Sequence, residues 1–300
     1  MALKKFLMAG IVAAVLVACG DDDSSGFATR PSGDSSSACE DCDDSSSSKS
    51  KSSSSSSVTP KSSDSETSVS SSSVKSSSSK VPEPEGGVLI DSRDGQTYKT
   101  VTIGTQTWMA ENLNYAYIGI PYNYSGYTFD STSWCYGDNP ANCTKYGRLY
   151  TWAAAMDSVG EWSTNGKGCG DDKTCSPTYP VRGICPEGWH LPDSTEWNML
   201  FTAVGGKSIA GKKLKSTSGW NDYEKNIYNG TDAYAFSALP AGSRSHRGLF
   251  DDFGYYASFW SSTEFDSECV YLMDLYYYDD FANLHAINKD YAYSVRCVKD

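Results

Sequence analysis

The residues that decide the fold are Gly183-Ile-Cys-Pro-Glu-Gly-Trp-His-Leu-Pro-Asp-Ser-Thr-Glu-Trp-Asn-Met-Leu-Phe-Thr-Ala-Val-Gly205. Pro192 biases the residue before it toward an extended conformation, and Asp193 with Glu196 predicts an acidic variant of the capping box at a helix start. Apolar residues then recur at helical spacing and predict one buried face, made of Trp197, Leu200, Phe201 and Val204. Cys185 lies where a disulfide would anchor the preceding loop. The stretch therefore indicates a folded core braced by a disulfide.

The N-terminal residues predict export and a lipid anchor. Lys4 and Lys5 precede an apolar run over residues 6–17, which is too short for a membrane span and is typical of a signal peptide. The run ends in Leu16-Val-Ala-Cys19, which resembles a bacterial lipobox. We expect a signal peptide over residues 1–18 and lipidation of Cys19, with palmitate among the acyl chains. An ordinary signal peptide followed by an incidental cysteine is the alternative.

The segment after Cys19 reads as a tether. Asp21-Asp22-Asp23 resembles the export signal that sends some Gram-negative lipoproteins to the outer face of the outer membrane. Most of the following residues up to Lys80 are serine, and such a segment buries too little apolar surface to fold. We expect a disordered linker over residues 19–86, with an r.m.s. reach on the order of 45 Å. The expected location is the cell surface.

The acidic charge is spread over the whole mature chain. The net charge of the protein is −12, with −6 in residues 20–86 and −8 in residues 87–300. Neither part contains a basic patch, so nucleic acid and anionic lipid are not expected partners. The expected contact with the membrane is through the lipid anchor alone.

The cysteines predict disulfides, because an exported chain meets an oxidising environment. Cys39 and Cys42 lie in the serine-rich segment, where a local disulfide is the expected state. Seven cysteines fall within residues 87–300, and two short spacings favour local pairs, Cys135 with Cys143 and Cys169 with Cys175. Because seven is odd, one cysteine must stay free or pair elsewhere.

The remaining pattern predicts a single α+β domain over residues 87–300, with two main helices and an antiparallel sheet. Residues 97–103 and 106–109 read as a hairpin in which one of Trp108 and Met109 faces the core, and residues 114–130 read as a long loop. Helices are expected at 146–159, at 194–204 and at 207–214, and further strands at 234–239, 258–263, 269–275 and 293–298.

Seven motifs, in order along the chain, look like the Fibrobacter succinogenes major paralogous domain, a family of exported bacterial lipoproteins. They are Asp94-Gly-Gln-Thr-Tyr, Ile103-Gly-Thr-Gln-Thr-Trp-Met-Ala-Glu-Asn-Leu, Tyr146-Gly-Arg-Leu-Tyr-Thr-Trp, Cys185-Pro-Glu-Gly-Trp-His-Leu-Pro, Phe236-Ser-Ala-Leu-Pro-Ala-Gly, Phe259-Trp-Ser-Ser-Thr and Ser294-Val-Arg-Cys-Val-Lys-Asp. The resemblance covers nearly all of residues 88–300. It implies an exported domain and little about activity.

A fainter resemblance points to the formylglycine-generating sulfatase-modifying domains, which share the C-type lectin-like fold. It rests on His190-Leu-Pro-Asp-Ser-Thr-Glu-Trp and on Ser294-Val-Arg-Cys-Val. In that fold a helix cysteine is bridged to the last strand, which implies a disulfide between Cys185 and Cys297. The calcium motifs of the lectins are missing, and Trp220-Asn-Asp is read as a coincidence in a loop. Cys297 lacks the neighbouring cysteine that the enzymes use, so their activity is not implied.

Candidate chemistry is sparse. His190 is expected to be structural, His246 solvated and His285 isolated, and the sequence has neither a Ser-His-Asp order nor a zinc-ligand spacing. Two pairs of neighbouring carboxylates, Asp251-Asp252 and Asp279-Asp280, are candidates for Ca²⁺ binding, although adjacent Asp residues are also common in solvated turns. Tyrosines beside these pairs suit sugar rings, although tyrosine is also a common packing residue. The candidate ligand-binding residues are Arg244, Arg247, Asp251, Asp252, Tyr255, Tyr277, Asp279 and Asp280.

These observations favour a lipid-anchored, surface-displayed binding module that has no catalytic activity, requires no cofactor and recognises a glycan or a protein outside the cell. An enzyme with its site between the Arg244–Asp252 loop and the Tyr276–Asp280 segment is one alternative, either of the formylglycine-generating type or a hydrolase. A purely structural envelope protein is the other.

Overall fold

A computed structural model describes residues 86–124, 127–224 and 228–300 of the chain. The predicted signal peptide, the predicted lipidation site Cys19, the predicted serine-rich tether and the expected Cys39–Cys42 disulfide lie outside the described residues. In the described part, no helix combines the length and the apolar character that crossing a membrane requires.

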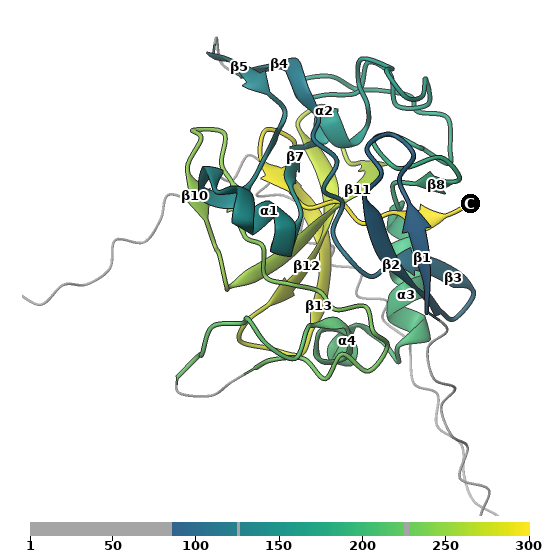
Figure 1. Ribbon diagram of the computed structural model, residues 1–300, viewed down its shortest axis with the longest axis vertical. Helices are drawn as coiled ribbons and strands as arrows, with labels where there is room; N and C mark the ends of the chain where they lie inside the picture. Colours follow the sequence, from purple (N-terminus) through teal and green to yellow (C-terminus); the bar gives the residue numbers. More distant parts are fainter. Residues whose placement is uncertain (1–85, 125–126, 225–227) are drawn as a thin grey trace, which may run out of the picture. The chain divides into compact units, whose positions relative to one another are not determined.

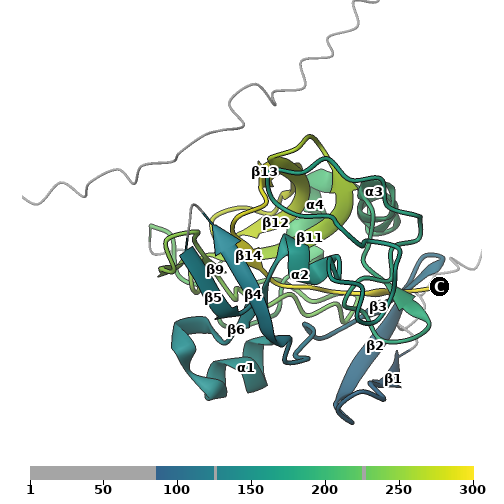
Figure 2. The ribbon, with the colours of Figure 1, turned by 90° about the horizontal axis from the view of Figure 1, so that it is seen from above.

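The described domain is α+β, and its strand pairs are antiparallel (Figures 1 and 2). The predicted fold class is therefore confirmed at this level. The helices are the 3₁₀ helix η1 (Tyr136–Asp138), α1 (Pro140–Tyr146), α2 (Trp152–Ala155), α3 (Ser194–Ala203) and α4 (Lys207–Leu214).

The strands form four sheets. One five-stranded sheet has the order β1 (Gly86–Ile90), β2 (Thr97–Ile103), β3 (Gln106–Met109), β15 (Val298–Lys299) and β8 (Trp189–His190). A second has the order β10 (Phe250–Asp251), β9 (Ser243–Arg244), β14 (Ala292–Tyr293), β7 (Leu149–Thr151) and β6 (Ser133–Trp134). The third sheet is β11 (Tyr256–Glu264), β12 (Cys269–Tyr276) and β13 (Ala282–Asn288), and the fourth is β4 (Ile118–Tyr124) with β5 (Tyr127–Ser131).

The three-stranded sheet contributes side chains to two hydrophobic clusters, and it runs through the middle of the domain in Figure 1. Because successive side chains of a strand point to opposite faces, Phe259 and Met273 belong to one cluster and Trp260 and Leu272 to the other. All four side chains are buried. The sheet therefore acts as the central layer of the domain.

Helix α3 forms as predicted. The Asp193 side chain accepts a hydrogen bond from the Glu196 amide at 2.8 Å, and the Glu196 carboxylate accepts one from the Asp193 amide at 2.9 Å. The apolar face of the helix is buried, and the Trp197 ring lies 4.7 Å from the Trp108 ring between centroids. This reciprocal capping box fixes where the helix begins.

Three disulfides join pairs of described residues. Cys135 is bonded to Cys143, Cys169 to Cys175, and Cys185 to Cys297 across a sequence separation of 112 residues. The two pairs expected from spacing and the pair implied by the resemblance are thus all present. The seventh cysteine of the domain, Cys269, is buried at the start of β12.

The predicted helix over residues 146–159 is wrong. Gly147 has φ of 73°, and a Cβ atom there would lie 2.6 Å from Cβ of Asn112, so the chain must turn where the helix was expected. The residues before the turn form α1, residues 149–151 form strand β7, and the last of these, Thr151, caps the short helix α2. A helical apolar pattern is here overridden by close packing against a distant segment.

The predicted strand over residues 234–239 is also wrong. Ala235 and Ser237 have φ of 54° and 52°, in the left-handed region that breaks an extended strand. The carbonyl oxygens of Phe236 and Ser237 accept hydrogen bonds from the Arg296 guanidinium rather than from a neighbouring strand. A buried cation therefore takes the acceptors that a sheet would use.

Four further expectations need smaller corrections. The predicted loop over 114–130 contains the hairpin of β4 and β5, and the predicted strand 293–298 is split into β14 and β15. Strand β13 was not predicted at all. Both Trp108 and Met109 are buried, one in each main cluster, because both faces of the first sheet are covered at that point.

Candidate functional site

The structure divides the eight candidate ligand-binding residues into two groups. Tyr255, directly before β11, contacts Tyr277, and Asp279 and Asp280 follow Tyr277 after the end of β12. Arg244, Arg247, Asp251 and Asp252 belong to the β9–β10 hairpin and its flanks. The carbonyl oxygen of Asp252 connects the two groups, because it accepts hydrogen bonds from the Tyr255 and Tyr256 amides.

The first group lies in a set of aromatic rings that we call the tyrosine platform, in which Tyr223, Tyr255 and Tyr278 are exposed and Tyr277 is half-buried against the core. The Tyr277 ring is 4.8 Å from the Tyr255 ring, 5.6 Å from the Tyr223 ring and 5.2 Å from the Tyr278 ring between centroids. The rings of Tyr223, Tyr255 and Tyr278 are 38–41% exposed. Edge-to-face contacts of this kind hold the rings in fixed orientations while leaving ring faces open to solvent.

Backbone contacts place the platform. The Tyr277 amide donates to the carbonyl oxygen of Tyr255 at 2.9 Å, which aligns the two segments. The Asn221 amide donates to the carbonyl oxygen of Gly254 at 2.8 Å and so brings the loop of Tyr223 against the same turn. Gly254 has φ of 83°, and a Cβ atom there would meet the Asn221 side chain at 2.6 Å. Only glycine allows this approach.

Lys215 holds the turn beneath the tyrosine platform by hydrogen bonds to its backbone. Its side chain is fully buried, and its Nζ donates to the carbonyl oxygens of Tyr276 at 2.9 Å and Asp279 at 2.7 Å. Burial lowers the pKa of this ammonium group to about 8, and the negative charges of Asp280 and Asp279 counteract that effect only in part. Lys215 therefore fixes the turn that carries Tyr277 and Tyr278.

The carboxylates beside the platform are engaged within the protein. Asp279 accepts a hydrogen bond from the Phe281 amide at 3.1 Å, and burial raises the pKa of its carboxyl group. Asp280 forms an ion pair with Lys212 of α4 at 3.3 Å. Among the described residues, no three side chains of His, Cys, Asp or Glu gather in a way that would hold a metal ion.

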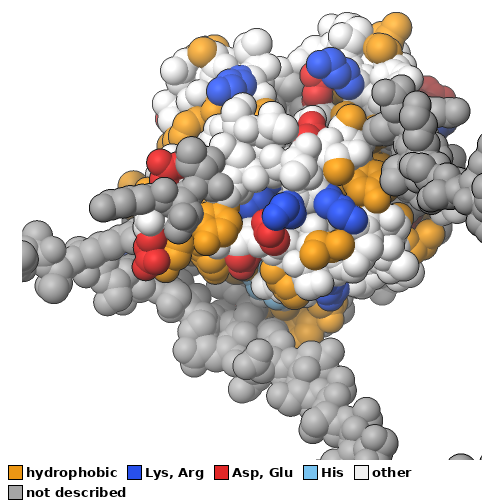
Figure 3. Space-filling model, turned by 90° about the horizontal axis from the view of Figure 1, so that it is seen from below, with side chains coloured by type: hydrophobic (Ala, Val, Ile, Leu, Met, Phe, Trp, Pro, Cys, Tyr) orange, Lys and Arg blue, Asp and Glu red, His pale blue; other side chains and the backbone are white. Residues whose placement is uncertain are grey.

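Charges of both signs mix on the face of Figure 3. Basic side chains lie directly beside acidic ones, and hydrophobic side chains are scattered between them. Within the part of the chain that the structure describes, this face therefore shows no continuous patch of one sign.

Arg244 does not line an open site. Its side chain is buried, and its guanidinium lies 4.1 Å from the centroid of the Trp134 ring and 5.6 Å from that of Phe250. This geometry is a cation–π contact inside the second sheet. Arg247 and Asp251, by contrast, are exposed.

Each histidine lies within 4 Å of a carboxylate. His190 is hydrogen-bonded to Glu196 at 2.9 Å and to Asp300 at 2.7 Å, in agreement with a structural role. His246 lies 3.8 Å from Asp290 with a side chain only 14% exposed, and His285 lies 3.6 Å from Asp274, so the descriptions of these two as solvated and isolated are wrong. The pairs form after folding because their partners are distant in sequence or on a neighbouring strand.

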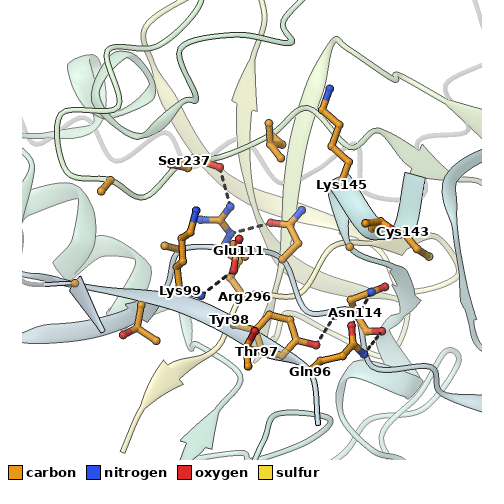
Figure 4. Close-up of a pocket in the computed structure, with 18 of the residues that line it drawn as sticks. Gln96, Thr97, Tyr98, Lys99, Glu111, Asn114, Cys143, Lys145, Ser237 and Arg296 are labelled. Atoms are coloured by element: carbon orange, nitrogen blue, oxygen red, sulfur yellow. Dashed lines mark hydrogen bonds between the residues drawn. The ribbon is translucent and has the colours of Figure 1, made fainter. Parts of the chain in front are cut away.

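A second feature is a cavity of about 490 Å³ between the first sheet, the end of α1 and residues 235–239. Figure 4 shows Lys99, Glu111 and Arg296 grouped around one part of it, with Ser237 nearby and Lys145 on the wall formed by α1. This cavity was not predicted, because its residues come from segments that are far apart in sequence and no local pattern connects them.

Arg296 lies at the floor of this cavity. It is fully buried, and its guanidinium donates to Oδ1 of Asn112 at 2.8 Å, to the carbonyl oxygen of Ser237 at 3.0 Å and to that of Phe236. All three acceptors are neutral. Burial lowers the pKa of Arg296 to about 9, although Asp232 and Glu111 act in the opposite direction.

A family model described as the Fibrobacter succinogenes major domain matches residues 101–299. The chain belongs to this family. The resemblance drawn from the seven motifs is thereby confirmed. No curated protein and no solved structure matches the chain, so the fainter similarity to the formylglycine-generating domains is not borne out.

The motifs of this Fibrobacter domain occupy the walls of two cavities. Five of the seven supply lining residues to the 490 Å³ cavity: Gln96, Glu111, Gly147, Ser237 and Arg296 represent one motif each. The other two supply His190, Leu191 and Ser262 to a smaller cavity of about 240 Å³. The sequence features that identify the family thus converge in space.

Proposed function

We propose that this protein is a cell-envelope lipoprotein whose Fibrobacter domain is a binding module without catalytic activity. In this proposal Cys19 carries the lipid, the serine-rich segment spaces the domain from the outer membrane, and the domain binds a glycan outside the cell. The domain would have the C-type lectin-like arrangement, in which a helix cysteine is bridged to the last strand. The bridge between Cys185 and Cys297 supports the expected pairing, although Cys185 lies in the loop before β8 and Cys297 directly precedes β15.

The observation that carries the proposal is the tyrosine platform. A sugar ring presents an apolar C–H face and a rim of hydroxyl groups. The exposed rings of Tyr223, Tyr255 and Tyr278 offer apolar faces held by mutual contacts, and Asp280 and Lys212 offer polar groups beside them. Clusters of exposed aromatic side chains mark interaction sites more often than isolated ones do.

A protein ligand is the second candidate, because tyrosine is also enriched in protein–protein interfaces. The same platform would then be the contact surface. An enzymatic or purely structural role has no comparable observation in its favour, since Arg244 is buried against aromatic rings and the two halves of the suggested catalytic site fall in different groups.

The experiment for the ligand uses the full mature chain with its disulfides intact. The chain is applied to an array of plant and bacterial polysaccharides, once with calcium and once with a chelator. We expect saturable binding to at least one glycan, and the chelator arm reports whether Ca²⁺ takes part. Absence of binding to every glycan would contradict the proposal, and pull-down from envelope extracts would then test a protein ligand.

The anchor is tested separately by mass spectrometry of the mature N-terminus. We expect the mature chain to begin at Cys19 and to carry acyl chains. An unmodified, water-soluble N-terminus would contradict the anchor without affecting the binding proposal.

A further inference from the structure

The 490 Å³ cavity carries an excess of positive charge in an acidic protein. Lys99, Lys145 and Arg296 line it, against one carboxylate, Glu111, while the protein as a whole has a net charge of −12. No ion pair within residues 86–124, 127–224 and 228–300 involves any of these three cations. A concave site lined by cations concentrates anions from solution.

The buried guanidinium makes this charge excess costly. Arginine has five N–H donors, and Arg296 uses three contacts to neutral oxygens without any direct contact to a carboxylate. A charge that is removed from water without a counter-charge is unfavourable, and the field of a nearby anion lowers that energy. An anion in the cavity would therefore contact Lys99 directly, and its electric field would also stabilise the buried charge of Arg296.

The remaining lining groups are amides and hydroxyls. Gln96, Asn114, Thr97, Thr144 and Ser237 face the cavity. The Asn114 side-chain amide donates to Oε1 of Gln96 at 2.7 Å, which orients both side chains on one wall. Such groups form hydrogen bonds with hydroxyl groups, and the volume lies within the range of small-molecule sites.

We infer that this cavity binds an acidic sugar, with the carboxylate of a uronic acid beside Lys99 and above Arg296, and with the sugar hydroxyls at the amide and hydroxyl wall. The site shares no residue with the tyrosine platform, so it stands or falls independently of the proposed function. Five family motifs meet at this cavity because they build its walls.

The test is calorimetric titration of the full mature chain with galacturonic acid oligomers. Three further probes are used: the methyl esters of the same oligomers, neutral galactose oligomers, and acetate. We expect saturable binding of the acid form alone, because the ester keeps the sugar and removes the charge. Absence of binding, equal binding of the ester, or equally strong binding of acetate would overturn the inference.

Substitution of Lys99, which is exposed, and of Glu111, which is partly exposed, should change the affinity in opposite directions without disturbing the core. Lys99→Met should weaken binding of the acid about two- to fivefold, because it removes one attractive charge. Glu111→Gln should strengthen binding by a similar factor, because it removes the one carboxylate and keeps an acceptor for the Lys99 amide.

Lys167→Met is the matched control, since Lys167 is exposed and does not line the cavity. A gain of affinity in Glu111→Gln cannot arise from misfolding. If Lys99→Met behaves like Lys167→Met, or if Glu111→Gln weakens binding, the inference is wrong.

Discussion

The Nζ atom of Lys215 lies 2.9 Å from the carbonyl oxygen of Tyr276. A second hydrogen bond, to the carbonyl oxygen of Asp279, closes the turn that carries Tyr277 and Tyr278. A cation at the end of α4 thus fixes the orientation of an aromatic surface that forms after β12.

Replacement of this cation should loosen the platform. Lys215→Met leaves two buried carbonyl oxygens without donors, so we expect a loss of about 2–4 kcal/mol in the free energy of unfolding, together with weaker glycan binding. Urea denaturation and binding assays measure the two effects. The exposed Lys212→Met variant is the control and should change stability by no more than about 0.5 kcal/mol. Equal losses of stability in the two variants would show that the buried contact does not matter; only stability is compared, because Lys212 belongs to the proposed binding surface.

The disulfides should contribute unequally. Removal of the Cys185–Cys297 bridge frees a 112-residue loop in the unfolded state and should destabilise the protein by about 5 kcal/mol. Removal of Cys169–Cys175, with a separation of 6, should cost about 2 kcal/mol. Chemical denaturation of the paired Cys→Ala variants measures both. A larger loss from the short bridge would contradict the assignment of Cys185–Cys297 as the main brace.

His190 should make stability depend on pH. Burial opposes its charge, but hydrogen bonds to Glu196 and Asp300 outweigh that effect and raise the pKa of His190. The folded protein then holds a proton that the unfolded chain releases, so this contribution is complete below pH about 6.5 and is lost as pH rises through the folded pKa. Urea unfolding between pH 5 and 8 should show a slope that His190→Gln reduces. An unchanged slope in the variant would exclude His190 as its source.

Lys289 should be essential for the loop that connects β11 to β12. Its buried Nζ contacts Oε1 of Glu264 at 2.5 Å and the carbonyl oxygens of Asp266 and Ser267 at 2.7 and 2.8 Å. Lys289→Met should cost about 3–5 kcal/mol, because Glu264 is left as an unpaired, nearly buried charge. Adding Glu264→Gln should restore part of the loss. If the double variant is less stable than Lys289→Met alone, the unpaired Glu264 carboxylate is not the cause of the lost stability.

The sequence correctly predicted those features that depend on residues close together in the chain. Helix α3 begins at its capping box because Asp193 and Glu196 are three residues apart, and the hairpin of β2 and β3 follows from Gly104. The two short disulfides follow from spacing, whereas Cys185–Cys297 needed the family resemblance.

The features that the sequence did not predict depend on contacts between residues that are far apart in the chain. Gly147 ends the expected helix because it packs against Asn112, and the strand expected at 234–239 is broken where its carbonyls turn to Arg296. The platform was predicted in part, since Tyr255 and Tyr277 were singled out, while Tyr223 reaches it through a loop that shows no periodic pattern. The cavity was missed because Asn112 and Arg296, which meet at its floor, are 184 residues apart.

The most direct test of the central claim is the affinity of the Tyr277→Ala variant for whichever glycan the array identifies. The claim predicts that Tyr277→Ala weakens binding by about tenfold, because the ring contacts three other platform tyrosines. Phe265→Ala, an exposed aromatic residue at the opposite end of the β11–β12 ladder, should bind like the unmodified protein. Unchanged affinity in Tyr277→Ala, or an equal loss in Phe265→Ala, would contradict the tyrosine platform as the binding surface.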